Sequence, residues 1–205
     1  EMRKSTLGGP LDGTLREKAV FDEQGLVGVP DHLTDEEAAT LTCAGVTAWN
    51  ALTNGDSLKS GETVLLLGTG GVSMFALQFA KTMGARVIMT SSSDEKLETV
   101  GEMGADETIN YESTPDWDEA VMERTDGQVA DRVVEVGGAG TLQKSLDAAA
   151  LGGHVSIIGV LSGVSGDLAV TSALMKGLTM QGILVGSRTD FEAMNRAILE
   201  NKLRP

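Results

Sequence analysis

A glycine-rich turn at residues 68–73 is the part of this 205-residue sequence whose residue types and spacing best suit chemistry. The apolar run Thr63–Leu67 precedes it. Gly68 permits a tight turn and Gly70 lets the backbone approach a phosphate, while the next helix offers unpaired N–H groups and the positive end of its dipole. Ser73 replaces the third glycine of the G-x-G-x-x-G pattern and is still small enough for close packing of helix on strand. The turn therefore predicts a site for the pyrophosphate of a dinucleotide.

The segments on either side must position this turn. Apolar residues recur at helical spacing through residues 72–83, Gly84 follows, and a second apolar run covers residues 86–90. These elements make a β-α-β unit of about 30 residues, the setting in which such a turn binds a dinucleotide. The alternative is a plain strand-to-helix connection that binds nothing, because glycine turns also serve that purpose.

The residues after the second strand indicate which dinucleotide binds. An NAD site usually has an acidic residue about 20 residues beyond the glycines, where it binds the ribose 2′-hydroxyl. This chain has Thr90–Ser93 there instead. Small hydroxyl side chains leave room for a 2′-phosphate, and Lys96 supplies a positive charge to pair with it. We therefore expect a preference for NADP(H), with NAD(H) as the other possibility.

These residues also have a purely structural interpretation. Ser92 and Glu95 fit a capping box at a helix start, with Lys96 as a solvated helix lysine. The charges of Asp94 and Glu95 would oppose a phosphate unless their side chains point away.

Composition limits the classes of partner. The formal net charge is −14, which makes nucleic acid and anionic membrane surfaces poor partners. The chain has one cysteine, Cys43, so it cannot form an internal disulfide, and it has neither an apolar stretch of transmembrane length nor a signal peptide core at its start. We expect a cytoplasmic protein without membrane or nucleic-acid partners.

Strands and helices alternate along most of the chain. Beyond the glycine-turn unit, strands are predicted at 107–110, 131–136, 154–159 and 179–185, and helices at 117–124, 140–149, 172–176 and 190–200. The alternation predicts an α/β fold with a doubly wound parallel sheet. Residues 34–52 predict a preceding helix that opens with a capping box at Thr34 and Glu37. Residues 15–21 and 25–30 predict two short strands, which cannot close a sheet by themselves.

Four stretches together resemble the medium-chain dehydrogenase/reductase superfamily, which includes zinc-type alcohol dehydrogenases and quinone oxidoreductases. They are residues 37–49 (EAATLTCAGVTAW), the glycine turn through Gln78, residues 104–111, and residues 152–159. The resemblance implies that residues 34–205 are a Rossmann domain truncated at its C-terminal end. It also implies that residues 1–33 are the tail of a GroES-like β catalytic domain, so that the chain is a fragment of a longer enzyme.

The resemblance further implies which residues contact the cofactor. The expected contacts are Thr47, Gly68, Gly70, Gly71, Val72, Ser73, Ser91, Ser92, Lys96, Tyr111, Val136, Gly137, Ile158, Gly159, Val160, Gly186 and Ser187. Tyr111 fits equally well as an amphipathic residue at a strand end. Arg188 belongs with Gly186 and Ser187 to the segment expected near the nicotinamide amide, and it fits equally well as a cap on the sheet edge or a partner of nearby carboxylates.

Cys43 matches the third catalytic zinc ligand of zinc-dependent members of this superfamily. Zinc needs three protein ligands, and the others would lie in the N-terminal domain that this chain lacks. The alternative, which we favour, is a buried apolar cysteine in an alanine-rich helix. His32 and His154 are interpreted as structural residues.

The function implied is hydride transfer between NADP(H) or NAD(H) and a small alcohol, aldehyde or ketone. A zinc-independent NADPH:quinone or enone reductase is the alternative enzyme, and a non-catalytic nucleotide-binding protein is an alternative of another class. Neither a catalytic acid nor a catalytic base can be named. A homodimer is expected, with the strand at residues 179–185 as its exposed edge.

Overall fold

The computed structural model describes residues 6–205 and contains a six-stranded, all-parallel sheet in the order β3-β2-β1-β4-β5-β6. The strands are β1 (Thr63–Leu66), β2 (Arg86–Ser91), β3 (Glu107–Asn110), β4 (Ala130–Glu135), β5 (Ala149–Ile157) and β6 (Thr179–Gly182). The helices are α1 (Asp35–Thr40), α2 (Val46–Thr53), α3 (Gly71–Thr82), α4 (Asp94–Glu102), α5 (Trp117–Arg124), α6 (Leu142–Asp147), α7 (Val170–Lys176) and α8 (Arg188–Asn201). This order is that of a Rossmann fold, so the predicted doubly wound α/β architecture is confirmed.

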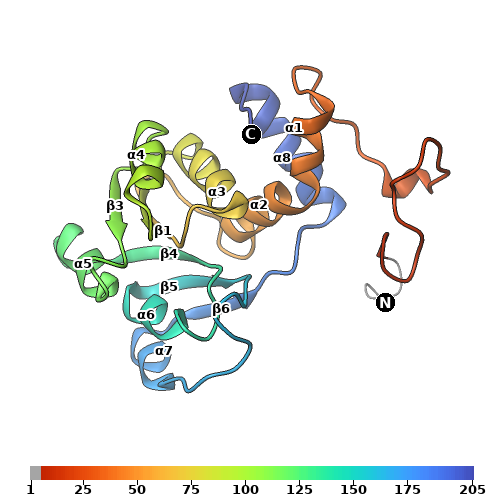
Figure 1. Cartoon of the computed structure of the whole chain (residues 1–205). Helices are drawn as coiled ribbons and strands as arrows, with labels where there is room; N and C mark the ends of the chain where they lie inside the picture. The colour runs from red at the N-terminus through yellow and green to blue at the C-terminus, as the bar shows by residue number, and fades with distance from the viewer. Residues whose placement is uncertain (1–5) are drawn as a thin grey trace.

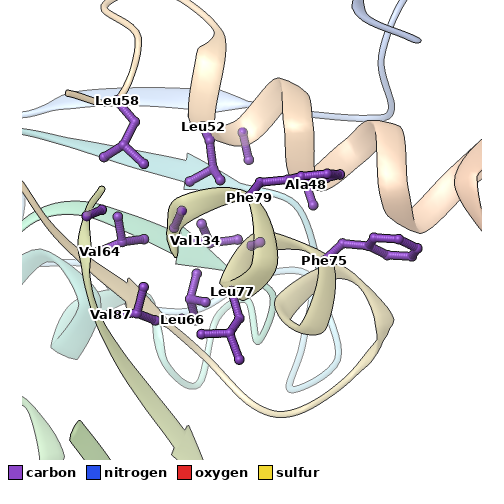
Figure 2. Close-up of a cluster of buried hydrophobic side chains, with 14 of the residues drawn as sticks. Ala48, Leu52, Leu58, Val64, Leu66, Phe75, Leu77, Phe79, Val87 and Val134 are labelled. Carbon is purple, nitrogen blue, oxygen red and sulfur yellow. The ribbon is translucent and has the colours of Figure 1, made fainter. Parts of the chain in front are cut away.

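Helices cover both faces of the sheet (Figure 1). Val64 and Leu66 of β1 face one cluster of buried side chains, with α2, α3, α4 and α8, whereas Leu65 faces a second cluster with α5 and α6. Figure 2 shows part of the first cluster, in which side chains of β1, β2 and β4 meet those of α2 and α3. A strand alternates its side chains between the two faces, so burial on both sides explains the continuous apolar runs seen in the sequence.

The predicted helix at residues 34–52 is interrupted. Its capping box is confirmed, because Thr34 N donates to Glu37 Oε2 at 2.8 Å and Glu37 N donates to Thr34 Oγ1 at 3.2 Å. Between α1 and α2, however, Leu41–Gly45 form a π-helical turn. The extra residue of a π turn rotates the side chains that follow, and Leu41 and Gly45 become the buried members of this segment.

The two short strands predicted at residues 15–21 and 25–30 were wrong. Residues 6–33 contain a 3-10 turn, Glu23–Gly25, and an isolated bridge between Leu7 and Leu11, but no strand of a sheet. Figure 1 shows this segment extending away from the sheet and its helices. A strand requires a neighbouring strand for its backbone hydrogen bonds, and within the described part of the chain none lies beside this segment.

Two strands have a boundary that differs from prediction by several residues. β5 begins at Ala149 rather than at His154, because Ala149 already pairs with Ala130 across an irregularity in the ladder. β6 is shorter than predicted and ends at Gly182, although it is the edge strand, as expected.

None of the helices in residues 6–205 combines the length and apolarity needed to cross a membrane.

Candidate functional site

The glycine turn lies between β1 and α3 and leaves open space above its backbone. Gly68 has a φ of +68°, a conformation that glycine adopts without strain. Gly70 is the N-cap of α3, at φ −80° and ψ 173°, and cannot cap the helix with a side chain. A Cβ built on Gly68 or Gly70 would meet no heavy atom within 4 Å. Gly70 and the first residues of α3 therefore border an accessible space, and the free amides of a helix start suit an anion.

Ser73 packs the start of α3 against the end of β1. It is 1% exposed, and its Oγ donates to Leu67 O at 2.7 Å. The hydroxyl thus gives the Leu67 carbonyl, just beyond the strand, a hydrogen-bond donor. A glycine at position 73 could not supply this donor. Close helix-on-strand packing with serine at the third position of the pattern is confirmed.

The space above the turn is a cavity of about 460 Å³, here called the turn pocket. Its lining contains ten of the predicted contact residues, Gly68, Gly70, Gly71, Val72, Ser73, Ser91, Ser92, Lys96, Tyr111 and Val136, together with Leu67, Thr69 and Leu161. A second cavity of about 360 Å³, the side pocket, shares five of these residues, among them Gly68, Tyr111 and Val136. It adds Thr90, Trp117, Gly137, Thr141 and Ser162. The two cavities together run along the carboxyl edge of the sheet, where open α/β sheets bind ligands.

The end of β2 is hydrogen-bonded to the glycine turn. Gly68 N donates to Thr90 Oγ1 at 3.2 Å, and Thr69 Oγ1 lies 3.4 Å from Ser91 Oγ. These contacts fix the distance between the turn and the hydroxyl-rich segment that follows β2. Lys96 is exposed at the rim of the same pocket.

The capping box predicted with Ser92 and Glu95 was wrong by one residue. Helix α4 begins at Asp94, so the residue before it, Ser93, is the N-cap and accepts a hydrogen bond from Lys96 N at 3.4 Å. Ser92 is instead part of the wall of the turn pocket. The structure thus assigns capping and pocket lining to different serines.

Asp94 is directed toward β3 rather than into the turn pocket. Asn110 Nδ2 donates to Asp94 Oδ1 at 2.6 Å, and neither Asp94 nor Glu95 belongs to the pocket lining. The acidic charges that weighed against a phosphate in the sequence therefore lie outside the wall that Ser92 and Lys96 form.

The loops after β4 and β5 pack backbone against backbone. A Cβ on Gly159 would lie 1.9 Å from Val136 O, and a Cβ on Gly138 would lie 2.7 Å from Val160 Cα. Ile158 N donates to Glu135 O at 2.8 Å. Gly159 and Val160 line a separate cavity of about 220 Å³ rather than the turn pocket. Gly138 lines this cavity too, whereas Leu161 lines the turn pocket with Val136, so the structure brings the two predicted loop segments together in both walls.

Sequence reasoning missed Glu135, the last residue of β4. It is 0% exposed and accepts hydrogen bonds from the amides and hydroxyls of the loop and helix that follow. The available signal was an acidic residue that follows the apolar pair Val133–Val134 and directly precedes Val136–Gly138.

Gly186 and Ser187 lie apart from the turn pocket. They line a cavity of about 690 Å³ beside the end of α2. Ser187 caps α8 by accepting from Asp190 N at 3.2 Å, and Arg188 donates to Glu192 at 2.8 Å and to Gln24 O at 2.9 Å. Thr47 is 2% exposed within α2. Of the interpretations of Arg188, pairing with a carboxylate is observed.

The preferred interpretation of Cys43 as a buried residue was wrong. Cys43 is exposed, on the π-helical turn, and lines an apolar groove of about 510 Å³ with Met74, Phe75 and Met103. Among residues 6–205, no three His, Cys, Asp or Glu side chains are grouped so that they could hold a metal ion. His32 Nε2 bonds to Leu203 O at 3.0 Å and His154 lies within β5, consistent with structural roles.

Comparisons with a family model, with related sequences and with solved structures all point to the same family. The model of a family described as zinc-binding dehydrogenase matches residues 71–200. A zinc-type alcohol dehydrogenase-like protein of Schizosaccharomyces pombe is 44% identical over 207 residues, which cover 98% of this chain and 60% of that protein. A crystal structure from Sinorhizobium meliloti 1021, provisionally assigned as an alcohol dehydrogenase, is 44% identical with a TM-score of 0.92, over 98% of this chain and 59% of its own.

A second solved structure, an NAD-dependent alcohol dehydrogenase, is 36% identical with a TM-score of 0.89, over 97% of this chain and 58% of its own. The chain therefore spans about 60% of the length of the proteins that it matches.

Proposed function

The chain belongs to the zinc-binding dehydrogenase family of the medium-chain dehydrogenase/reductase superfamily, and on that premise we propose that it is the cofactor-binding part of an NADP(H)-preferring oxidoreductase. The substrate proposed is a small alcohol, aldehyde or ketone. The observation that carries the proposal is the start of α3, where glycines line a pocket whose lining also includes Ser92 and Lys96.

The pyrophosphate is assigned to the start of α3. Its amides donate to phosphate oxygens, and the helix dipole favours negative charge at this end. This local arrangement matters because the chain carries a net charge of −14, so long-range attraction does not favour an anionic cofactor. Gly70 allows the contact, because no Cβ separates the backbone from the phosphate.

The 2′-phosphate of NADP(H) is assigned to Ser91, Ser92 and Lys96. Hydroxyl groups and an ammonium group line the pocket at the position where an NAD site usually has a carboxylate. Asp94 is held by Asn110 and does not face this position. NAD(H), which lacks this phosphate, gains nothing from Lys96.

The remaining parts of the dinucleotide are assigned along the edge of the sheet. The side pocket is largely apolar and contains Tyr111 and Trp117, which suits an adenine ring. The nicotinamide half then lies over β4 and β5, because the two halves of this sheet each take one nucleotide. When bound, the nicotinamide ring supplies or accepts the hydride, and the contribution of this chain is to hold and orient it.

Zinc does not fit the described residues, since Cys43 stands without further ligands among residues 6–205. We propose that residues 34–205 are the cofactor domain and that residues 1–33, of which the structure describes 6–33, belong to the catalytic domain of the whole protein. Under this division, the groups that select the substrate are contributed by that domain.

We further propose a cytoplasmic homodimer joined at β6. This strand is an edge of the sheet, and Leu184 just beyond it is 73% exposed. Unpaired strand edges are usually covered, and a second copy can continue the sheet. Sedimentation equilibrium of the full-length protein tests this, with a monomer as the contradicting result.

Calorimetric titration of the full-length protein with NADPH and with NADH tests the cofactor assignment. We expect both to bind, with NADPH at least tenfold tighter, because a charge-assisted contact contributes about 1.5–3 kcal/mol. If neither NADPH nor NADH binds, the proposal is contradicted. Turnover of a panel of alcohols, aldehydes, ketones and quinones, together with metal analysis, then separates an alcohol dehydrogenase from a quinone reductase.

A further inference from the structure

The buried carboxylate of Glu135 organises the turn that follows β4. Its Oε1 accepts hydrogen bonds from Gly137 N at 2.6 Å, Gly138 N at 2.9 Å and Thr141 Oγ1 at 2.7 Å, and its Oε2 accepts one from Ser145 Oγ. A carboxylate is the one side chain of this length that accepts four hydrogen bonds without donating any. The turn therefore depends on this residue for its shape.

The Val136–Gly138 turn also determines the position of the loop after β5. Ser162 N and Ser162 Oγ donate to Gly137 O at 2.7 and 2.8 Å, and Ala139 N donates to Gly163 O at 3.1 Å. Glycine at 138 and 159 lets the two backbones touch, because a Cβ at either position would overlap the opposite loop. Neither loop can shift without the other.

The Glu135 turn is also a wall of the candidate site. Val136 lines both the turn pocket and the side pocket, and Gly137, Thr141 and Ser162 line the side pocket. By contrast, Ser145 lies in α6, is 0% exposed, and belongs to none of the linings described above. Oε1 of Glu135 thus accepts hydrogen bonds from the turn that forms the pocket wall, while Oε2 accepts one from Ser145 in the protein interior.

We propose that Glu135 is a positioning residue for the dinucleotide, whose carboxylate holds the Val136–Gly138 turn and the adjoining loop in the shape that the cofactor binds. The inference rests on the proposed function, because it concerns the same site. It adds a buried residue that belongs to neither pocket lining and acts through the turn.

Three variants of the full-length protein separate positioning from general stabilisation, with NADPH as the probe. Glu135→Ala leaves the amides of Gly137 and Gly138 without their acceptor. Glu135→Gln keeps an acceptor for them if its amide group faces Ser145, whose hydroxyl can accept instead of donate. Ser145→Ala removes the hydrogen bond to the other oxygen and leaves the turn intact. Each variant is measured for its dissociation constant and for its thermal midpoint.

We expect Glu135→Ala to raise the dissociation constant for NADPH about tenfold, the effect of freeing a turn from a buried acceptor. Glu135→Gln should stay within about threefold of the wild type, and Ser145→Ala within about twofold even if its midpoint falls. Unchanged binding by Glu135→Ala overturns the inference, as does an equal loss of binding by Ser145→Ala.

If Glu135→Ala does not fold, Glu135→Asp takes its place, because its shorter side chain withdraws the carboxylate from the turn amides. It should lose about tenfold in affinity, and normal affinity overturns the inference. A wild-type protein that binds neither NADPH nor NADH overturns the proposed function itself and this inference with it, an outcome visible before any variant is measured.

Discussion

Asn110 Nδ2 donates a hydrogen bond of 2.6 Å to Asp94 Oδ1, and this contact ties the first residue of α4 to the last residue of β3. Asp94 stands only two residues from Ser92 and Lys96, which line the turn pocket. Its carboxylate is held outside that lining, so the positive charge of Lys96 at the pocket rim is not opposed there by a neighbouring acid.

Removing the side-chain amide of Asn110 should show whether its hydrogen bond keeps Asp94 away from the turn pocket. In Asn110→Ala the Asp94 carboxylate is free to turn toward the pocket, and we expect NADPH affinity to fall about threefold through charge repulsion. The additional change Asp94→Asn should restore it. Titration of the single and double variants with NADPH is the measurement, and an Asn110→Ala protein with unchanged NADPH affinity contradicts the relationship.

Lys96→Ala should reduce the preference for NADPH. Loss of a charge-assisted contact is expected to weaken NADPH binding by about tenfold or more and leave NADH binding nearly unchanged. Lys81→Ala is the matched control, because Lys81 pairs with Asp106 at 2.7 Å and lies outside the turn pocket. Equal weakening of both dinucleotides would show that Lys96 does not recognise the 2′-phosphate.

Gly70→Ala should separate binding from folding. The backbone at Gly70 suits alanine, and its Cβ would meet no protein atom within 4 Å. We therefore expect the free energy of unfolding to change by less than about 0.5 kcal/mol, while dinucleotide affinity falls at least tenfold. Urea denaturation and titration with NADPH measure the two effects. Retained affinity would mean that phosphate does not approach this backbone.

Ser73→Ala should lower stability and leave dinucleotide affinity nearly unchanged. The variant loses the bond from Ser73 Oγ to Leu67 O and leaves that carbonyl without this partner. We expect the free energy of unfolding to fall by about 1 kcal/mol. NADPH affinity should stay within about twofold, because the methyl group fits the same space beside β1. A large loss of affinity without a loss of stability would contradict this assignment.

His154 should make stability depend on pH. Burial, and then the positive charge of neighbouring Arg132, hold the pKa of His154 below its ordinary value. The unfolded chain therefore binds the proton more tightly than the folded chain, and the free energy of unfolding decreases as the pH falls below about 6.5. His154→Gln should flatten this dependence. Urea denaturation between pH 5 and 8 measures it, and identical curves for both proteins would contradict it.

The sequence predicted the sheet and the glycine turn because both depend on local patterns. Apolar runs such as Thr63–Leu67 mark strands buried on both faces, and the glycines of the turn mark a backbone that needs freedom and access. The capping box at Thr34 was also predictable, because both partners lie within three residues.

What the sequence could not determine depends on contacts between distant segments. The strands expected at residues 15–30 have no neighbouring strand among the described residues, and the π-helical turn leaves Cys43 exposed where an alanine-rich helix suggested burial.

The sequence by itself determined the fold class, the glycine turn between β1 and α3 and the absence of an acid at the end of β2. Only the tertiary structure decided that Asp94 faces β3, that Ser93 rather than Ser92 caps α4, and that Glu135 organises the turn after β4. The physical reason is that each of these depends on which donor or acceptor a side chain reaches once the strands are packed, and residue type and spacing alone do not fix that choice.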